Sequence, residues 1–573
     1  MIHPTPAIVT QLAARRLPRW VLILMGLLYV VPGFLGRDPW RSDDLASFGV
    51  MWSLALGQSD WWSPSLLGEP AVSAGWLPYW LGALAIQWLF FLPADLAAKV
   101  PFGLLLTLTL TSTWYGVFHL ARLPGAQPVL FAFGGEAHPI DYARATADAA
   151  FLALVASLGV VMLAHETTVD AARLAFVALA FHAAARILSP FVRSHGKTVM
   201  LWSIAAFGLA WSGVPGLALA LGLLAMAPIL VAKGLRLGLL GAASSIPTWV
   251  WITGLATTVL AAGSAVSVGA DWHPHPWSWS NWLHMEDWQR WGRLLLWFTW
   301  PTGLLALWAM WTWRRHWQSA HWFIPVTWAG LLLLLSWLDG GRDRTLLLAM
   351  PMLATLAAFS LSTLRRSVSA WLDWFSVLFF TGGALIIWVI WMAMMTGVPA
   401  QPAANVAKLA PFFTPSWQPV LFLPALLMTL GWLGVIVWRL GRHRPAIWKS
   451  LVLSASGFTL CWVLLMTLWL PLLNHGMGQV SISSRVATQI PSGQCVVVQG
   501  LSHAQIAGLL YHAELAMVRE TQPDATQCHW LITVGGSPAG RTPGIDRAQW
   551  QLVERIPRLR ENRETWLLYQ RLP

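Results

Sequence analysis

Long apolar runs separated by short polar segments dominate the pattern of this chain. The runs at 21–34, 102–110, 201–230 and 294–311 contain few or no charged residues. About 20 such residues cross a bilayer as a helix, so the pattern predicts about thirteen transmembrane helices. We expect these spans near 19–35, 101–121, 147–164, 171–188, 199–213, 215–232, 246–265, 294–313, 322–338, 345–364, 374–396, 419–438 and 451–473.

The basic residues decide how these spans are oriented. If the apolar run 76–93 does not cross the membrane, Arg15 and Arg16 lie on the same side as later basic loops such as Arg314 and Arg315. The positive-inside rule favours that arrangement. We therefore expect a cytoplasmic N-terminus, a first outer loop at about 37–99, and an interfacial or re-entrant helix within that loop. The first ~18 residues lack the apolar region and following cleavage site of a signal peptide, so the first apolar run is expected to be a retained anchor.

From about residue 474 the pattern changes to that of a small α/β domain. One segment has the spacing of a helix, and four have the composition or alternation of strands. The helix is expected at 504–515 and the strands at 495–499, 530–534, 551–556 and 566–569. The predicted organisation is therefore a transmembrane domain at 1–473 and a periplasmic α/β domain at 474–573.

Three cysteines are present. Cys495 and Cys528 each open a predicted strand, and an oxidising outer compartment would permit a disulfide between them. Two free thiols in a core are the alternative. Cys461 lies in a predicted span and is expected to pack there.

Composition supports a polytopic helical membrane protein. Hydrophobic residues make up 57% and charged residues only 10% of the 573 residues, whereas soluble domains carry about 25% charged residues. The net charge is +12, but there is no soluble basic domain to bind nucleic acid, and topology-setting loop arginines explain the excess. Many of the 41 tryptophans lie near the ends of apolar runs, which is typical of interface anchors.

Two adjacent carboxylates, Asp43 and Asp44, follow the first apolar run directly. In a carboxylate-poor membrane protein, acids at the membrane boundary are a candidate functional site. One of them can serve as a general base while the other positions a substrate or holds a metal. The alternative is a structural role at the start of a helix, because Ser42, Asp43 and Asp44 have the composition of a helix N-terminus.

Two other short outer loops carry polar candidates. The first contains His165, Glu166 and Asp170, whose acids are either held close to the helices or are ordinary solvated turn residues. The second contains Arg342 and Arg344 beside two glycines. Arginine guanidinium groups and glycine amides suit a phosphate or pyrophosphate. A surface Arg–Asp pair of little energetic value is the alternative for this loop.

The loop 271–293 is rich in histidine, acidic residues and tryptophan, and could bind a metal or a sugar. An amphipathic interfacial loop is the alternative. Its candidate side chains are His273, His275, His284, Glu286 and Asp287. No phosphate-binding loop of nucleotide enzymes, dinucleotide fingerprint or His-Glu-x-x-His motif is present, so cytoplasmic nucleotide chemistry is not expected.

The opening of the chain resembles that of the GT-C glycosyltransferases. The residues that carry the resemblance are the segments 36–44 (Gly-Arg-Asp-Pro-Trp-Arg-Ser-Asp-Asp), 57–70 (Gly-Gln-Ser-Asp-Trp-Trp-Ser-Pro-Ser-Leu-Leu-Gly-Glu-Pro) and 77–83 (Leu-Pro-Tyr-Trp-Leu-Gly-Ala). The most similar branch is the aminoarabinose transferases that modify lipid A, which are related to the protein O-mannosyltransferases. The resemblance covers the architecture of residues 1–364, and an outer C-terminal domain is also typical.

The resemblance implies site residues and a reaction. Asp43 or Asp44 would act as general base, a second acid would correspond to Glu166 or Asp170, and Arg342 and Arg344, with Arg41, would bind the donor phosphate. The implied reaction is inverting transfer of a sugar from a polyprenyl-phosphate donor to a lipid, glycan or protein acceptor at the periplasmic face of the bacterial inner membrane. A divalent metal is compatible with it but is not specified.

Two departures separate this chain from the aminoarabinose transferases. Their Phe-Glu-Lys-Pro element, with its phosphate-binding lysine, is replaced at 73–78 by Ser-Ala-Gly-Trp-Leu-Pro, and an Arg-Tyr pair is replaced by Ala46 and Ser47. The aminoarabinose activity therefore does not carry over. A transporter or flippase for a lipid-linked sugar and a non-catalytic membrane subunit are the competing functions.

Overall fold

A computed structural model describes most of the chain. The described residues are 5–192, 194–234, 246–272, 285–440, 446–491, 493–536, 545–546, 548–557 and 564–572.

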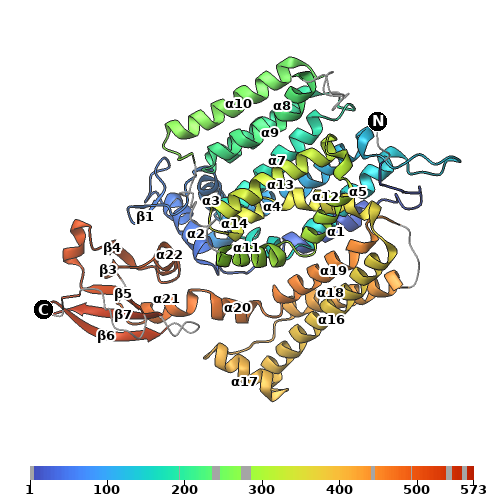
Figure 1. The fold of residues 1–573 in the computed structure, drawn as a ribbon. Coiled ribbons are helices and arrows are strands. Elements are labelled where there is room, and N and C mark those ends of the chain that lie inside the picture. The colour runs from blue at the N-terminus through green and yellow to red at the C-terminus, as the bar shows by residue number, and fades with distance from the viewer. Residues whose placement is uncertain are drawn as a thin grey trace.

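Helices make up the first part of the structure, with α4 as its centre. α4 packs against α5 and α7, and α2 packs against α3. Figure 1 shows these elements in blue and cyan within the helical bundle. Their bounds are α1 Arg19–Val30, α2 Ser42–Ala55, α3 Leu77–Trp88, α4 Ala94–Ala121, α5 Pro139–Val155, α6 Leu158–Leu163 and α7 Val169–Ile187.

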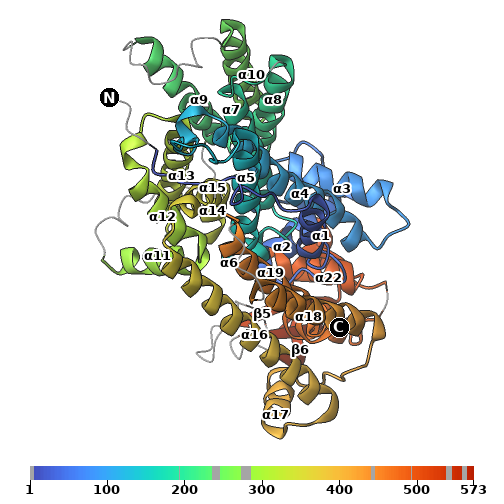
Figure 2. The ribbon, with the colours of Figure 1, turned by 90° about the vertical axis from the view of Figure 1, so that its right-hand side faces the viewer.

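The remaining helices extend the bundle in two directions. α8, α9 and α10 pack together at the top of Figure 1, whereas α16 and α18 lead to α17 at the bottom in both views (Figures 1 and 2). The bounds are α8 His195–Trp211, α9 Pro215–Gly234, α10 Thr248–Ser267, α11 Met285–Phe298, α12 Thr302–Thr312, α13 Ala320–Leu338, α14 Asp343–Leu347, α15 Met350–Ser360, α16 Arg366–Thr396, α17 Ala400–Leu409, α18 Pro419–Leu440, α19 Lys449–Leu465, α20 Leu470–Met477 and α21 Val480–Ala487.

Five described helices are long and apolar enough to cross a bilayer, and the number rises to seven if each of two bent pairs counts as one span. The count of thirteen spans therefore stays a prediction. Several predicted spans are broken. The segment 294–313 forms α11 and α12, bent by 98°, and 451–473 forms α19 and the start of α20, bent by 66°. Pro301 lies in the first break and cannot donate a backbone hydrogen bond, which favours a helix end there.

α3 occupies the run that the charge distribution excludes from the spans. Its 12 residues extend about 18 Å, less than the ~30 Å hydrocarbon core of a bilayer. It lies along α2 and α4. The interfacial or re-entrant position of this helix stays a prediction.

The C-terminal part contains a mixed sheet. Its strand order is β4-β3-β5-β7-β6; β3 is parallel to β4 and β5, and β7 is antiparallel to β5 and β6. Four of these strands and the helix were predicted, whereas β4 was missed. The bounds are β3 Cys495–Gln499, α22 His503–His512, β4 Ala516–Arg519, β5 Trp530–Gly536, β6 Trp550–Pro557 and β7 Glu564–Arg571. The division of the chain at residue 473 stays a prediction, because α20 runs across it.

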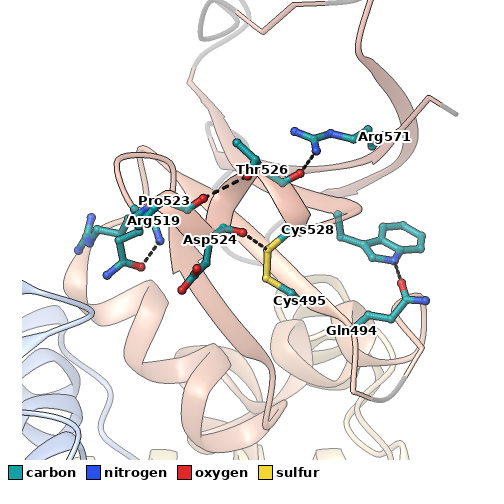
Figure 3. The surroundings of a disulfide bond; sticks show 10 residues. Gln494, Cys495, Arg519, Pro523, Asp524, Thr526, Cys528 and Arg571 are labelled. Carbon is teal, nitrogen blue, oxygen red and sulfur yellow. Dashed lines mark hydrogen bonds between the residues drawn. A yellow bond between two sulfur atoms is a disulfide. The ribbon is translucent and has the colours of Figure 1, made fainter.

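The two cysteines of this sheet form a disulfide (Figure 3). Cys495 begins β3, and Cys528 lies two residues before β5, which pairs with β3. The bridge therefore joins neighbouring strands at the same end of the sheet. Of the two alternatives for these thiols, the structure contains the disulfide.

Candidate active site

Three loops that are distant in the sequence meet at the guanidinium group of Arg344. Its Nε lies 2.9 Å from Asp43 Oδ2, its Nη2 lies 2.7 Å from Glu166 Oε2, and its Nη1 lies 3.9 Å from Asp170 Oδ2. The acids come from the first turn of α2, from the segment between α6 and α7, and from the first turn of α7. The structure thus brings together the acidic and basic segments that the sequence analysis predicts as candidate site residues.

The two adjacent aspartates have different surroundings. Asp44 is 1% exposed and pairs with Arg37 Nη2 at 3.1 Å. Its other oxygen accepts hydrogen bonds from the backbone N–H and the hydroxyl of Thr167, both at 2.7 Å. The side chain of Asp43 is 52% exposed. Asp44 therefore connects the start of α2 to the segment that carries Thr167, and Asp43 is the member of the pair that a ligand can reach.

The first turn of α2 explains why both acids are held there. The helix begins at Ser42, with Arg41 as its N-cap, and no side chain makes a capping hydrogen bond. Asp43 and Asp44 lie in the first turn, where unpaired backbone N–H groups favour negative charge. Successive helical residues point about 100° apart, so the neighbours face different environments.

Arg37 is a site residue that the sequence argument did not single out. It is 1% exposed and joins Asp44 to the carbonyl oxygen of His165, which accepts from its Nη2 at 2.5 Å. The one available signal was an arginine between an apolar run and an acid pair.

The ring of His165 does not join the acidic cluster. The residue is fully buried, and its Nδ1 and Nε2 face the carbonyl oxygens of Val161 and Tyr29. Burial lowers its pKa to about 4, so the imidazole is neutral at physiological pH. His165 was expected to join Glu166 and Asp170 as a polar site residue. Only its backbone carbonyl, which accepts a hydrogen bond from Arg37, lies at the site.

Glu166 is a fully buried carboxylate surrounded by charges. Its Oε2 lies 2.7 Å from Arg344, and its Oε1 lies 3.8 Å from Arg41 Nε. Burial and the nearby charge of Asp44 raise its pKa to about 7, against the opposing effect of Arg344 and Arg41. Glu166 therefore exchanges a proton near neutral pH.

A cavity of about 180 Å³ opens beside Arg344. One part of its lining is charged and the other is apolar, which suits a ligand with an anionic head and a hydrocarbon tail. The charged lining consists of Asp170, Arg173, Asp339, Arg342 and Arg344, and the apolar lining includes Val214, Leu217, Ala220, Leu331, Leu335 and Leu348.

Two of the three predicted phosphate-binding arginines line this cavity, and the third lies near Glu166. Arg344 and Arg342 line the cavity. Arg41 lies on the exposed side, 3.3 Å from Asp343. Arg173, which was not predicted, is held at the cavity by Asp170 at 2.8 Å and by the carbonyl oxygen of Ser212.

The three candidate histidines of the loop 271–293, His273, His275 and His284, lie outside the described residues. Asp287 lies on α11 and pairs with Arg290, and Trp288 of the same helix stacks on Trp337 at 4.1 Å. Within the described ranges, no group of three or more His, Cys, Asp or Glu side chains is placed to hold a metal ion.

Comparison with known proteins identifies the fold. No family model and no curated protein sequence matches the chain. Among solved structures, the chain is similar to ArnT from Cupriavidus metallidurans bound to undecaprenyl phosphate, with a TM-score of 0.58 and 14% identity over 96% of this chain and 97% of that chain. The apo state of the same protein gives a TM-score of 0.57, also at 14% identity and with the same coverage. The oligosaccharyltransferase of Archaeoglobus fulgidus is more distant, with a TM-score of 0.43 at 10% identity over 90% of this chain and 69% of that chain. The chain therefore has an ArnT-like fold, and the predicted fold class is confirmed.

Proposed function

We propose that this chain is an inverting glycosyltransferase that moves a sugar from a polyprenyl-phosphate donor to a lipid, glycan or protein acceptor. The observation that carries the proposal is Arg344, which joins three carboxylates at the charged end of a cavity with an apolar interior. The similar ArnT structure contains undecaprenyl phosphate, a ligand with an anionic head and an isoprenoid tail. We place the reaction at the periplasmic face of a bacterial inner membrane, with the N-terminus in the cytoplasm and the C-terminal domain outside.

The cavity lining supports this class of donor. Arg342, Arg344 and Arg173 supply positive charge for a phosphate group, and arginine binds phosphate through paired N–H donors. Leucine and valine side chains from α13 and the start of α9 supply an apolar surface for the first isoprene units. A volume of about 180 Å³ holds only part of such a lipid, so the rest of the tail would lie along the helices in the bilayer.

Asp43 is the proposed general base. It is the exposed acid of the cluster, and a base must reach the proton that it removes. The acceptor oxygen would attack the anomeric carbon and transfer its proton to Asp43. The bond from that carbon to the phosphate oxygen would break, and polyprenyl phosphate would leave with the electron pair. Arg344 and Arg342 would stabilise the negative charge that develops on it.

Glu166 and Asp170 would hold Arg344 in place until the donor binds. A donor phosphate at Arg344 competes with the carboxylate of Glu166. Because the pKa of Glu166 is already about 7, a second negative charge nearby would favour its protonation. The site would then keep its charge balance while Arg344 turns to the phosphate.

The proposal is tested with purified protein and polyprenyl-phosphate-linked sugars in vesicles. We expect Asp43→Asn and Arg344→Gln to lower donor consumption by about 100-fold or more, since general bases and charge-stabilising donors each contribute roughly that factor. Asp60→Asn is the matched control, because Asp60 is an exposed acid of the same outer loop. Wild-type donor consumption by Asp43→Asn would contradict the role of Asp43. Movement of the intact donor across the membrane without consumption would favour a transporter.

A further inference from the structure

The C-terminal domain contacts the helix that carries the acid pair. α22 packs against α2, and Figure 1 shows α22 between the sheet and that helix. The contact is close, since a Cβ added to Gly49 would lie 2.4 Å from the Cβ of Ala507. The ring of Tyr511 on α22 makes edge contacts with Phe48 and Trp52 on α2, with centroid distances of 4.8 and 5.5 Å.

The hydroxyl group of Tyr511 continues this contact into a polar pair on α4. It donates a hydrogen bond to Asp95 Oδ1 at 3.2 Å. The other oxygen of Asp95 lies 3.1 Å from Lys99 Nζ, one helical turn further on. Burial raises the pKa of Tyr511 to about 12, so its hydroxyl remains a donor throughout the physiological range. Tyr511 therefore orients the carboxylate that balances the Lys99 charge.

Lys99 connects this polar pair to the segment that precedes α2. Its side chain is 2% exposed, and its ammonium group also donates to the backbone carbonyl of Arg37. A buried ammonium group is costly unless its partners are in place. The side chain of Arg37 in turn binds Asp44 and the carbonyl of His165. The polar contacts that begin at Tyr511 therefore end at the sequence neighbours of Asp43 and Glu166, which contact Arg344.

We propose that Tyr511 is a positioning residue for the transfer reaction, acting through Asp95, Lys99 and Arg37 on Asp44. The effect on reaction rate rests on the function proposed above, whereas the physical coupling does not. Loss of the hydroxyl would loosen the carboxylate of Asp95 and thereby the backbone at Arg37. The segments that carry Asp43 and Glu166 would then sample a wider range of positions, which lowers the fraction of complexes ready to react.

A second contact keeps the domain attached when this hydrogen bond is lost. Glu69, at the tip of the hairpin formed by β1 (Ser65–Leu66) and β2 (Glu69–Pro70), pairs with Arg519 at 2.7 Å. His503 Nε2 lies 3.1 Å from the carbonyl oxygen of Pro70. Tyr511→Phe also retains the ring that packs on Phe48 and Trp52. This variant should therefore fold and keep the domain in place.

The test compares Tyr511→Phe with Tyr569→Phe in the full-length protein. Tyr569 lies on β7 of the same domain and is buried, and it takes no part in the contact between Tyr511 and Asp95. Hydrogen exchange is measured first, on peptides covering 37–48 and 165–168. Because one hydrogen bond to a charged group is lost, we expect about five-fold faster exchange in Tyr511→Phe and wild-type exchange in Tyr569→Phe. Unchanged exchange in Tyr511→Phe would overturn the coupling.

Kinetics then test whether the coupling serves the reaction. We expect Tyr511→Phe to lower kcat about five-fold with an unchanged KM for a polyprenyl-phosphate sugar. In an Asp44→Asn background the same change should have no further effect on kcat, because Tyr511 acts through Asp44. An equal loss in that background, or an equal loss in Tyr569→Phe, would overturn the positioning role. If the wild-type protein turns over no such donor, the proposed function is wrong. The hydrogen-exchange result would still show whether Tyr511 is coupled to the segments 37–48 and 165–168.

Discussion

Separate replacement of Asp43 and Asp44 by asparagine tests the division of roles between these neighbours. Asp44→Asn removes the charge that balances Arg37, and both side chains are 1% exposed. Breaking a buried ion pair in this way costs about 3–5 kcal/mol. The new amide oxygen can still accept from the N–H of Thr167, so we expect the lower end, about 3 kcal/mol of unfolding free energy.

Asp43→Asn should instead leave the unfolding free energy nearly unchanged and lower kcat. The side chain of Asp43 is 52% exposed, and Arg344 keeps its contact with Glu166 when Asp43 is neutral. An exposed ion pair contributes at most about 1 kcal/mol, so stability should change little. Loss of the general base should lower kcat by about 100-fold or more.

The assay measures unfolding free energy and kcat on the same purified variants in the same bilayer or detergent. Asp60→Asn serves as the control for an acid in the same loop. The assignment would be refuted if Asp44→Asn unfolded with the stability of the wild type while Asp43→Asn kept its kcat. It would also be refuted if Asp43→Asn were the variant that lost about 3 kcal/mol.

Three further predictions concern pH, the disulfide and topology. The pKa of Glu166 is about 7, and its protonation releases an arginine for phosphate. The KM for the donor should therefore fall as pH drops through that value and rise above it. Glu166→Gln should flatten this profile, and an unchanged slope in that variant would exclude the linkage. Replacing both Cys495 and Cys528 by serine removes a disulfide with a sequence separation of 33. This should lower the unfolding free energy of the C-terminal domain by about 4 kcal/mol. A variant as stable as the wild type would argue against a structural role of the disulfide. A cysteine that replaces Gln401, which is exposed on α17, should react with a membrane-impermeant thiol reagent in intact spheroplasts. A cysteine that replaces the exposed Arg315 should react only after permeabilisation. The reverse pattern would invert the proposed topology.

The sequence was sufficient to predict the fold class and to select the three segments that supply the candidate site residues. Charge asymmetry placed Asp43, Glu166 and Arg344 on one side of the membrane, and residues that share a side can meet even when they are distant in sequence. That they do meet, with Arg344 in contact with both acids, is a finding of the structure. In the C-terminal segment, short apolar runs predicted β3 and β5, and alternation of apolar and polar residues predicted β6 and β7.

The finer assignments needed the structure. Composition treats Asp43 and Asp44 alike, and only the direction of each side chain on α2 separates the exposed acid from the buried one. The burial of His165 depends on the packing of Tyr29, Phe34 and Trp462 around its ring, which no local pattern encodes. Hydropathy also cannot distinguish a straight span from a bent pair, so the break between α11 and α12 was missed.

The contact between α22 and α2 was beyond sequence reasoning for a similar reason. Gly49 and Ala507 are small residues in apolar surroundings, and their small size has meaning only once the two helices face each other. Tyr511 and Asp95 are 416 positions apart. No local periodicity relates two side chains at that separation.

The most direct test of the proposed function is mass spectrometry of the lipid fraction after purified protein is incubated with a membrane lipid extract containing polyprenyl-phosphate sugars. We expect the wild-type protein to convert one such donor to free polyprenyl phosphate, and Asp43→Asn to do so about 100-fold more slowly. If the wild-type protein leaves the donors in the extract unchanged, the proposed function is contradicted. If Asp43→Asn converts the donor as fast as the wild type, the role of Asp43 as general base is contradicted.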